Sequence, residues 1–379
     1  MAKPVSKRVP LIVVTALVGA LVASVLAVLT FGAQVSAGPD GVPVAVAVAD
    51  DPAAAQLRAA TGELEARAGD RLDIELTTPD RARSLLHDKE VYGVLELSSG
   101  PGGPQATVVT SGAINPSGTQ VARQALTGAG QALLAAVAAQ NPGANAGLVQ
   151  VERIHPVGTS MRAMPLALSA LAWLGCLVAG AALTLLAQRS RVRVGAMDRL
   201  AGLAVTSVAV TAVLVGLVLL WDSSLPLGWD VVGLLALAAA AFTAVQGGVL
   251  HLAGIRAMAL LAPLYLVAPA VTNQVPELLH PGYRVALWSW TPFRFPAEAL
   301  RSLFAGTPDA PDVMLAVWVL IGILALGLAL LAVPRRSAGQ QAEPHAADGV
   351  VDVGVDEADR LPRPQRERAA EHGDRRVRR

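Results

Sequence analysis

Apolar residues along this chain fall into six long runs separated by polar stretches. The runs begin near Leu11, Pro165, Ala201, Val231, Ile255 and Val313. A helix of about 20 apolar residues spans a bilayer, because lipid offers backbone groups no hydrogen-bond partner and a helix pairs them internally. The pattern therefore predicts a cytoplasmic N-terminus and first transmembrane helix over residues 1–36, then a polar insert, then a five-helix membrane bundle over residues 165–334.

The insert, residues 37–164, alternates the residue patterns of strands and helices. Strands are predicted over residues 42–49, 72–77, 91–97, 106–110 and 148–154, and helices over residues 53–68, 79–89 and 118–139. Such alternation is typical of a small α/β domain. The expected fold class is a membrane α-helical bundle of six transmembrane helices, arranged as one plus five, with an α/β extracytoplasmic domain between helices 1 and 2.

Composition narrows the classes of protein that fit this pattern. With 53% hydrophobic residues and a mean hydropathy of +0.51, the chain differs from soluble globular proteins. A net charge of +1 gives no electrostatic basis for binding nucleic acid, so we expect no such partner. Cys176 is the single cysteine, which excludes an intrachain disulfide and a cysteine-based zinc motif. We expect no metal and no cofactor.

The first apolar run has two interpretations. Val35, Ser36 and Ala37 resemble the small-residue cleavage site of a secretory signal peptide. The apolar region of a signal peptide is about 7–15 residues long, however, and this run extends from Leu11 to about Phe31. We therefore expect an uncleaved anchor. A mature protein that begins near Gly38 would contradict this prediction.

Basic residues in the short loops predict the orientation, since Lys and Arg concentrate on the cytoplasmic side of a membrane. Lys3 and Lys7 precede the first run. Four arginines follow the second run: Arg189, Arg191, Arg193 and Arg199. The loop between the third and fourth runs carries Trp221 and Trp229 and no Lys or Arg, as expected outside. This alternation predicts a multi-pass plasma-membrane protein with both termini in the cytoplasm.

The outer segment over residues 274–312 departs from this charge rule. Arg294, Glu298 and Arg301 are interleaved there with Trp and Phe residues. One interpretation is an amphipathic segment that lies on the membrane surface or dips into it. The alternative is a solvated loop with ordinary interfacial anchors, and the composition does not separate the two.

Polar residues inside the predicted spans are few. Candidate pathway residues are Thr206 and Thr211 in the third span, and Thr243 and Gln246 in the fourth. Intramembrane polar groups often mark a transport pathway, but Ser and Thr also bond to neighbouring helices or to their own backbone. No Asp, Glu, Lys or Arg lies deep within a span, which argues against a proton- or sodium-driven transporter.

Sequence motifs for chemistry are missing as well. No GxxxxGK[ST] phosphate-binding loop occurs, so ATP hydrolysis would require another chain. No predicted loop or span presents a paired acid and base or a nucleophile with a base. The sequence therefore predicts no catalytic residues and disfavours a membrane-embedded enzyme.

Three stretches in this order resemble the permease subunits of the ABC-2 exporter superfamily, especially the phage-infection-protein-like branch. They are VPVAVAVADDP (residues 42–52), DRARSLLHDKEVYGVLEL (residues 80–97) and TPFRFPAEALRSLFAG (residues 291–306). The resemblance covers nearly the whole chain up to Arg336. In that branch, one helix, a large outer domain and five helices follow one another.

The resemblance implies a non-catalytic permease in a bacterial plasma membrane, surrounded by membrane lipids. It implies a homodimer or heterodimer paired with a cytoplasmic ATP-binding subunit, and a lipid, drug or envelope component as the exported substrate. The loop carrying Arg189, Arg191, Arg193 and Arg199 would then be a candidate contact for the ATPase. Positive-inside topology alone explains the same arginines.

The C-terminal tail, residues 335–379, is rich in Pro, Gly, Ala and charge and has no apolar period, which predicts a disordered cytoplasmic segment. Its basic end suits either anionic lipid or solvent. For the whole chain, the alternative to an exporter subunit is an orphan membrane receptor or envelope scaffold whose outer domain binds a partner. Five packed helices exceed what anchoring needs, and this favours transport.

Overall fold

A computed structural model describes residues 8–49, 58–59, 61–62, 64, 69–100, 103–140, 147–156, 158, 160–191 and 195–334. The chain divides into two compact units, residues 1–335 and 336–379, and all described residues belong to the first. The predicted tail over residues 335–379 and most of the helix predicted over residues 53–68 lie outside the described residues.

Five strands form a mixed sheet in the order β2-β1-β3-β4-β5. Their bounds are β1 (Val42–Val48), β2 (Leu72–Thr77), β3 (Val94–Gly100), β4 (Gly103–Ser111) and β5 (Val149–Ile154). β1 runs parallel to both β2 and β3, β3 and β4 form an antiparallel pair, and β5 runs parallel to β4. The predicted small α/β domain is therefore present, with its strands close to the expected positions.

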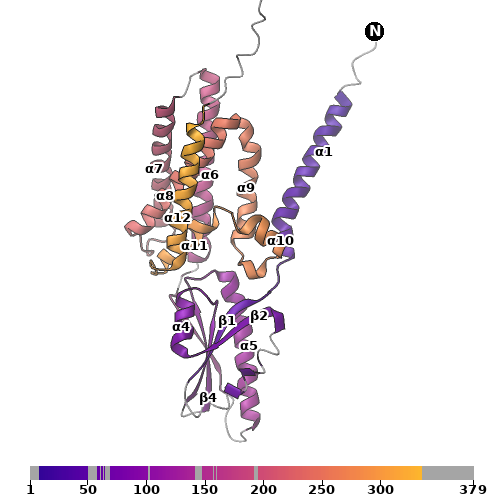
Figure 1. Cartoon of the computed structure of the whole chain (residues 1–379), viewed down its shortest axis with the longest axis vertical. Helices are drawn as coiled ribbons and strands as arrows, with labels where there is room; N and C mark the ends of the chain where they lie inside the picture. The colour runs from indigo at the N-terminus through magenta and orange to yellow at the C-terminus, as the bar shows by residue number, and fades with distance from the viewer. Residues whose placement is uncertain are drawn as a thin grey trace, which may run out of the picture. The chain divides into compact units, whose positions relative to one another are not determined.

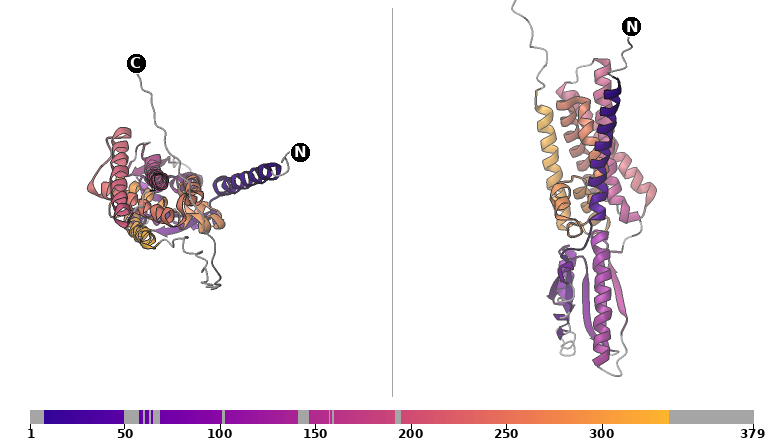
Figure 2. Two further views of the ribbon diagram at one scale, coloured as in Figure 1. Left: turned by 90° about the horizontal axis from the view of Figure 1, so that it is seen from above. Right: turned by 90° about the vertical axis from the view of Figure 1, so that its right-hand side faces the viewer.

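The alternation of β1 distributes its side chains between two helices. Val44, Val46 and Val48 pack on the long helix α5 (Pro116–Gln140), whereas Ala45 and Ala47 pack on α4 (Pro79–His87). Successive side chains of a strand point to opposite faces, so one strand supplies both cores of the domain. Both views show α5 extending along the sheet (Figures 1 and 2).

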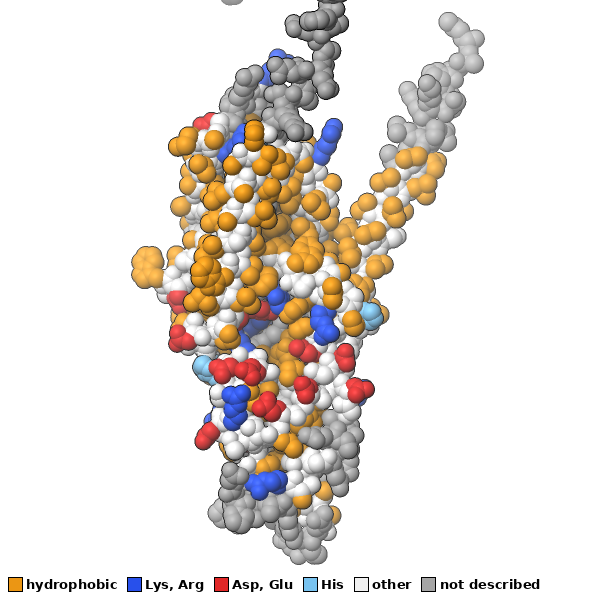
Figure 3. Space-filling view, viewed as in Figure 1, with side chains coloured by type: hydrophobic (Ala, Val, Ile, Leu, Met, Phe, Trp, Pro, Cys, Tyr) orange, Lys and Arg blue, Asp and Glu red, His pale blue; other side chains and the backbone are white. Residues whose placement is uncertain are grey.

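Among the described residues, five apolar segments are long enough to cross a membrane: Ala16–Val35, Ser160–Ser190, Ala196–Trp221, Trp229–Thr272 and Pro311–Ala332. They comprise part of α1 (Arg8–Ala27) and the whole of η1 (Val28–Gly32), α2 (Ala33–Val35), α6 (Ser160–Ser190), α7 (Ala196–Trp221), α8 (Trp229–Ala253), η4 (Gly254–Ala257), α9 (Met258–Thr272) and α12 (Pro311–Ala332). Apolar side chains cover the bundle and α1, while charged side chains gather over the α/β domain and its border with the bundle (Figure 3). Exposed apolar surface of this extent indicates a multi-pass membrane protein.

The fourth and fifth predicted spans form one 44-residue segment rather than two independent candidates. Within it, Gly254 has a φ of +62°, a backbone conformation that glycine adopts readily, and the chain turns there between α8 and α9. α9 has 15 residues, which gives a length of roughly 22 Å against a hydrocarbon core of about 30 Å. Six separate crossings therefore stay a prediction.

Helix α8 is the centre of the bundle and packs on α6, α7 and α12. Three rings fill the space between α8, α6 and the segment before α11: Trp173, Phe242 and Phe293, with ring centroids 5.0–6.1 Å apart. By contrast, α1 diverges from the other helices in Figure 1 and in the view from above in Figure 2, and its apolar side chains are mostly exposed. Only its end near η1 packs against α9.

The segment over residues 274–312, for which the sequence left two interpretations open, packs on both the bundle and the α/β domain. It folds into η5 (Pro276–Leu278), α10 (Pro281–Tyr283), η6 (Arg284–Trp288) and α11 (Arg294–Phe304). Nine of the 11 residues of α11 are buried, including Arg301, and the helix packs on α6 and α12. Most of α11 is therefore covered by the rest of the protein, and Arg301 is buried together with its apolar residues.

Candidate functional site

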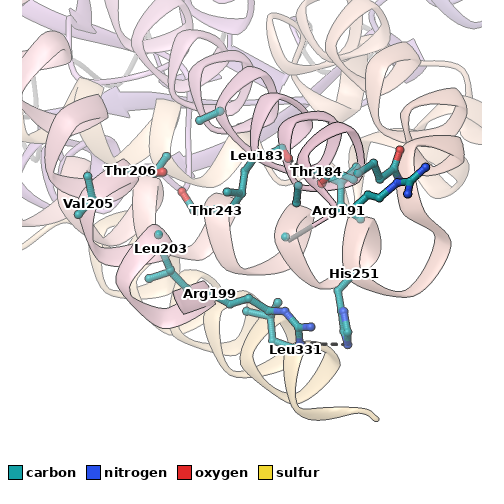
Figure 4. A pocket seen from close by; sticks show the side chains of 17 residues that line it. Leu183, Thr184, Arg191, Arg199, Leu203, Val205, Thr206, Thr243, His251 and Leu331 are labelled. Carbon is teal, nitrogen blue, oxygen red and sulfur yellow. Dashed lines mark hydrogen bonds between the residues drawn. The ribbon is translucent and has the colours of Figure 1, made fainter. Parts of the chain in front are cut away.

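A cavity of about 680 Å³ lies between α6, α7 and α8, at the end of the bundle that carries the arginine-rich loop (Figure 4). Glycines create much of this space, since Gly180, Gly202 and Gly247 face it from α6, α7 and α8 respectively. A Cβ on Gly180 would lie 3.0 Å from Leu250 of α8. The cavity walls are mainly apolar, and its volume falls within the range of about 300–1,000 Å³ typical of small-molecule sites.

The mouth of the cavity is cationic. Arg191 follows α6, Arg199 lies near the start of α7, and His251 lies near the end of α8. Among the described residues that line the cavity, none is Asp or Glu. Asp198, the acidic residue next to Arg199, instead caps α7 by accepting a hydrogen bond from the N–H of Gly195 at 2.9 Å. An anionic group is therefore the charge type that this mouth favours.

His251 links three helix ends at this mouth. Its Nε2 lies 3.3 Å from Nη1 of Arg199 and 3.0 Å from the carbonyl oxygen of Val333 (Figure 4). A neutral imidazole nitrogen either donates or accepts, so it serves the Val333 carbonyl or the Arg199 guanidinium, but not both. A change of tautomer at His251 would therefore exchange one contact for the other.

The cavity brings together some of the candidate residues from the sequence. Arg191 and Arg199 line it, and so do Thr206 and Thr243, which point toward one another (Figure 4). Arg189 is exposed and does not line the cavity. Arg193 lies outside the described residues. The arginine-rich loop and half of the predicted polar pathway thus meet at one place.

Two predicted pathway residues have structural roles instead. Thr211 donates its hydroxyl to the carbonyl of Ser207 in its own helix at 2.7 Å. Gln246 is fully buried and donates from Nε2 to the carbonyl of Trp173 at 3.1 Å, which joins α8 to α6. The Thr211 bond thus lies within one helix, the Gln246 bond joins two helices, and neither side chain lines the cavity.

A second polar cluster joins the α/β domain to the bundle. Lys89, directly after α4, donates to Oδ2 of Asp312 in the first turn of α12 at 2.7 Å and also to the hydroxyl of Ser302 in α11. Ser302 donates to the same Asp312 oxygen at 2.7 Å. The Lys89 and Asp312 side chains are 15% and 14% exposed. Burial lowers the pKa of Lys89, and the charge of Asp312 opposes that effect.

Tyr92 and the residues before β1 add further links across the same border. The hydroxyl of Tyr92 donates to Oε2 of Glu277 at 2.8 Å, and burial together with that carboxylate raises the pKa of Tyr92. The N–H groups of Gly38 and Asp40 donate to the carbonyls of Leu278 and Glu277, each at 3.0 Å. These bonds fix the domain to the segment between α9 and α11.

Arg294, Glu298 and Arg301 of α11 lie at this border. The guanidinium of Arg294 is 3.7 Å from the ring centroid of Trp288, a cation–π contact. Burial raises the pKa of the Glu298 carboxyl, and the nearby Arg294 and Arg301 oppose the shift. Arg301 is 4% exposed, and burial lowers its pKa.

Sequence reasoning singled out the segment that contains α11 but missed Lys89, Tyr92, Glu277 and Asp312. The hydrogen-bonded partners are 185–223 residues apart in the chain, so no local pattern indicates that they meet. The described residues contain no group of three or more His, Cys, Asp or Glu side chains that could hold a metal ion. No family model, curated protein or solved structure matches this chain.

Proposed function

We propose that this chain is the integral membrane permease subunit of an ABC-2 type exporter, which moves a lipid, drug or envelope component out of the cell. It works as a homodimer or heterodimer, and a separate cytoplasmic ATP-binding subunit supplies the energy. The observation that carries this proposal is the cavity between α6, α7 and α8, with apolar walls and a cationic mouth. The exporter resemblance of the sequence supports it from an independent direction.

The cavity favours an amphipathic anion as substrate. Leu183, Leu203 and Leu331 offer apolar contact, while Arg191 and Arg199 offer charge at one end. A lipid-like molecule with an anionic head satisfies both surfaces at once. The same arginines also lie in the loop proposed to contact the ATPase. The substrate and the ATP-binding subunit would therefore contact the same region of the chain.

In the proposed orientation, both termini and the cavity mouth face the cytoplasm of a bacterial cell and the α/β domain faces outward. The positive-inside distribution of Lys and Arg supports this placement. This proposed orientation includes six crossings, of which α9 is the fifth.

Cysteine labelling tests the orientation. A membrane-impermeant maleimide should label Ser223→Cys, in the exposed turn between α7 and α8, on intact cells. It should label Ser190→Cys, at the exposed end of α6, only after lysis. The native Cys176 is 1% exposed and provides the unlabelled background in both variants. The reverse labelling pattern would invert the proposed topology.

A cavity-filling substitution tests the transport role. Thr206→Trp places a large ring in the cavity and should reduce efflux of a fluorescent anionic amphiphile at least about tenfold, by removing roughly 1.4 kcal/mol or more of binding free energy. Val208→Trp is the control, because Val208 lies on the same helix, is 71% exposed and does not line the cavity. Equal efflux by the two variants would exclude the cavity as the substrate site.

Co-purification distinguishes the exporter from the receptor or scaffold. The full chain, isolated from its native membrane, should retain an ATP-binding subunit, and its deletion should lower efflux. Absence of an ATPase together with unchanged efflux would reject the exporter and favour a membrane receptor or scaffold whose outer domain binds a partner.

A further inference from the structure

A second, smaller cavity of about 90 Å³ lies where the α/β domain meets α6 and α11. It is lined by the turn after β4, by the first turn of α5, and by side chains of β5, α6 and α11. Its volume is far below the range of about 300–1,000 Å³ for drug-sized ligands. The cavity therefore suits a single small group.

Four arginines line this cavity from four different elements: Arg123 of α5, Arg153 of β5, Arg162 of α6 and Arg301 of α11. None of the described residues that line it is Asp or Glu. Within the described part of the chain, none of the four side chains forms a hydrogen bond or an ion pair. Four like charges at one cavity repel one another unless an anion compensates them.

Arg301 is the buried arginine of this cavity. It is 4% exposed, and its buried Nε has no hydrogen-bond partner among the described residues. Arg301 also borders a neighbouring cavity of about 300 Å³, which Glu298 and Asp312 line. Glu298 and Asp312 therefore line the neighbouring cavity, whereas no described acidic residue lines the small cavity. Buried guanidinium groups are normally fully hydrogen-bonded, so this geometry indicates a missing acceptor.

The N-terminus of α5 also favours an anion in this cavity. Asn115 caps α5, since its Oδ1 accepts hydrogen bonds from the N–H and the hydroxyl of Ser117, each at 3.0 Å. The first turn of this 25-residue helix lines the cavity, and the N-terminus of a helix attracts anions. The buried hydroxyl of Thr119, also in this turn, has no hydrogen-bond partner among the described residues.

We propose that this cavity binds one tetrahedral oxyanion, a phosphoryl group carried either by a phospholipid headgroup or as free phosphate. Guanidinium groups pair with phosphoryl oxygens through parallel hydrogen bonds, and a helix N-terminus supplies further donors. Arg162 lies in the first turn of a candidate membrane span, so lipid headgroups are within reach of the site. The site is separate from the larger cavity and does not depend on the exporter proposal.

The experiment uses the full-length protein in nanodiscs of neutral digalactosyl diacylglycerol, which has no phosphoryl group. Thermal unfolding is followed after addition of inorganic phosphate, and separately with phosphatidylglycerol included in the disc. Ligand that binds only the folded state raises the melting temperature. Stabilisation by both ligands, or by one alone, supports a phosphoryl site and identifies its source.

Variants localise the effect. Arg153→Gln and Arg162→Gln, both at exposed rim positions, should weaken the apparent affinity at least about tenfold each. Arg81→Gln is the matched control, because Arg81 is an exposed arginine of α4 that pairs with Glu90 at 3.9 Å and does not line the cavity. Arg301 is left unchanged, since its burial makes folding depend on it. The proposal is overturned if neither ligand stabilises the protein, or if the rim variants respond as the control does.

Discussion

Replacing Gly327 with alanine should disrupt the contact between α8 and α12 and lower the free energy of unfolding by about 3 kcal/mol or more. A Cβ at this position would collide with the backbone of Ala244 and Val245 and lie 2.7 Å from Cβ of Ala244. Backbone atoms of a central helix cannot move aside as a flexible side chain can. Small residues allow membrane helices to approach closely, and Gly327 lies directly against the backbone of α8.

The measurement is thermal or denaturant unfolding of the purified protein in one detergent. Gly322→Ala is the control, because Gly322 lies five residues earlier in α12 and a Cβ there would meet no atom within 4 Å. This control should change stability little or increase it, since alanine favours helices over glycine by about 1 kcal/mol. Similar melting temperatures for the two variants would contradict the packing of α8 on α12.

Replacing Lys89 with methionine should weaken the attachment of the α/β domain to the bundle by about 3 kcal/mol. The Asp312 side chain is only 14% exposed, and the substitution removes the cation that pairs with it. Breaking a buried ion pair by removing one partner typically costs about 3–5 kcal/mol. Ser302 still donates to Asp312, which places the expected loss at the lower end. Unfolding of the full chain, followed with limited proteolysis of the α/β domain, measures the effect.

The double variant Lys89→Met/Asp312→Leu should be more stable than Lys89→Met, because it removes the unpaired carboxylate. Lys89 has a φ of +62°, a left-handed conformation that costs a non-glycine residue about 1–2 kcal/mol. Lys89→Gly should therefore lose roughly 1 kcal/mol less than Lys89→Met. If Lys89→Met and Lys89→Met/Asp312→Leu unfold alike, the ion pair does not hold the α/β domain on the bundle.

The local elements follow closely from the sequence. Alternation predicted β1, and the structure places it at Val42–Val48, because successive side chains of that strand meet two different cores. The long apolar runs predicted membrane helices, and five such segments are present. The fourth and fifth runs, predicted to begin near Val231 and Ile255, form one apolar segment in which the chain turns at Gly254 and α9 has 15 residues.

The candidate sites followed less closely from the sequence than the local elements did. Arg199 and Thr206 were visible in the sequence as polar positions, but their common cavity depends on glycines contributed by three helices. Arg301 was expected on a surface and is buried, because helix α11 turns its apolar face into the bundle. Its segment carries both aromatic and charged residues, and composition alone does not specify which neighbours cover them.

By itself, the sequence determined that this is a membrane protein with an α/β insert, because hydrophobic periodicity and run length are local properties of the chain. Only the tertiary structure decided which charges meet. Lys89 reaches Asp312 across 223 residues, and four arginines from separate elements surround one small cavity. Such contacts depend on how helices and strands pack, and burial then determines whether a charge is solvated, paired or left to bind an anion.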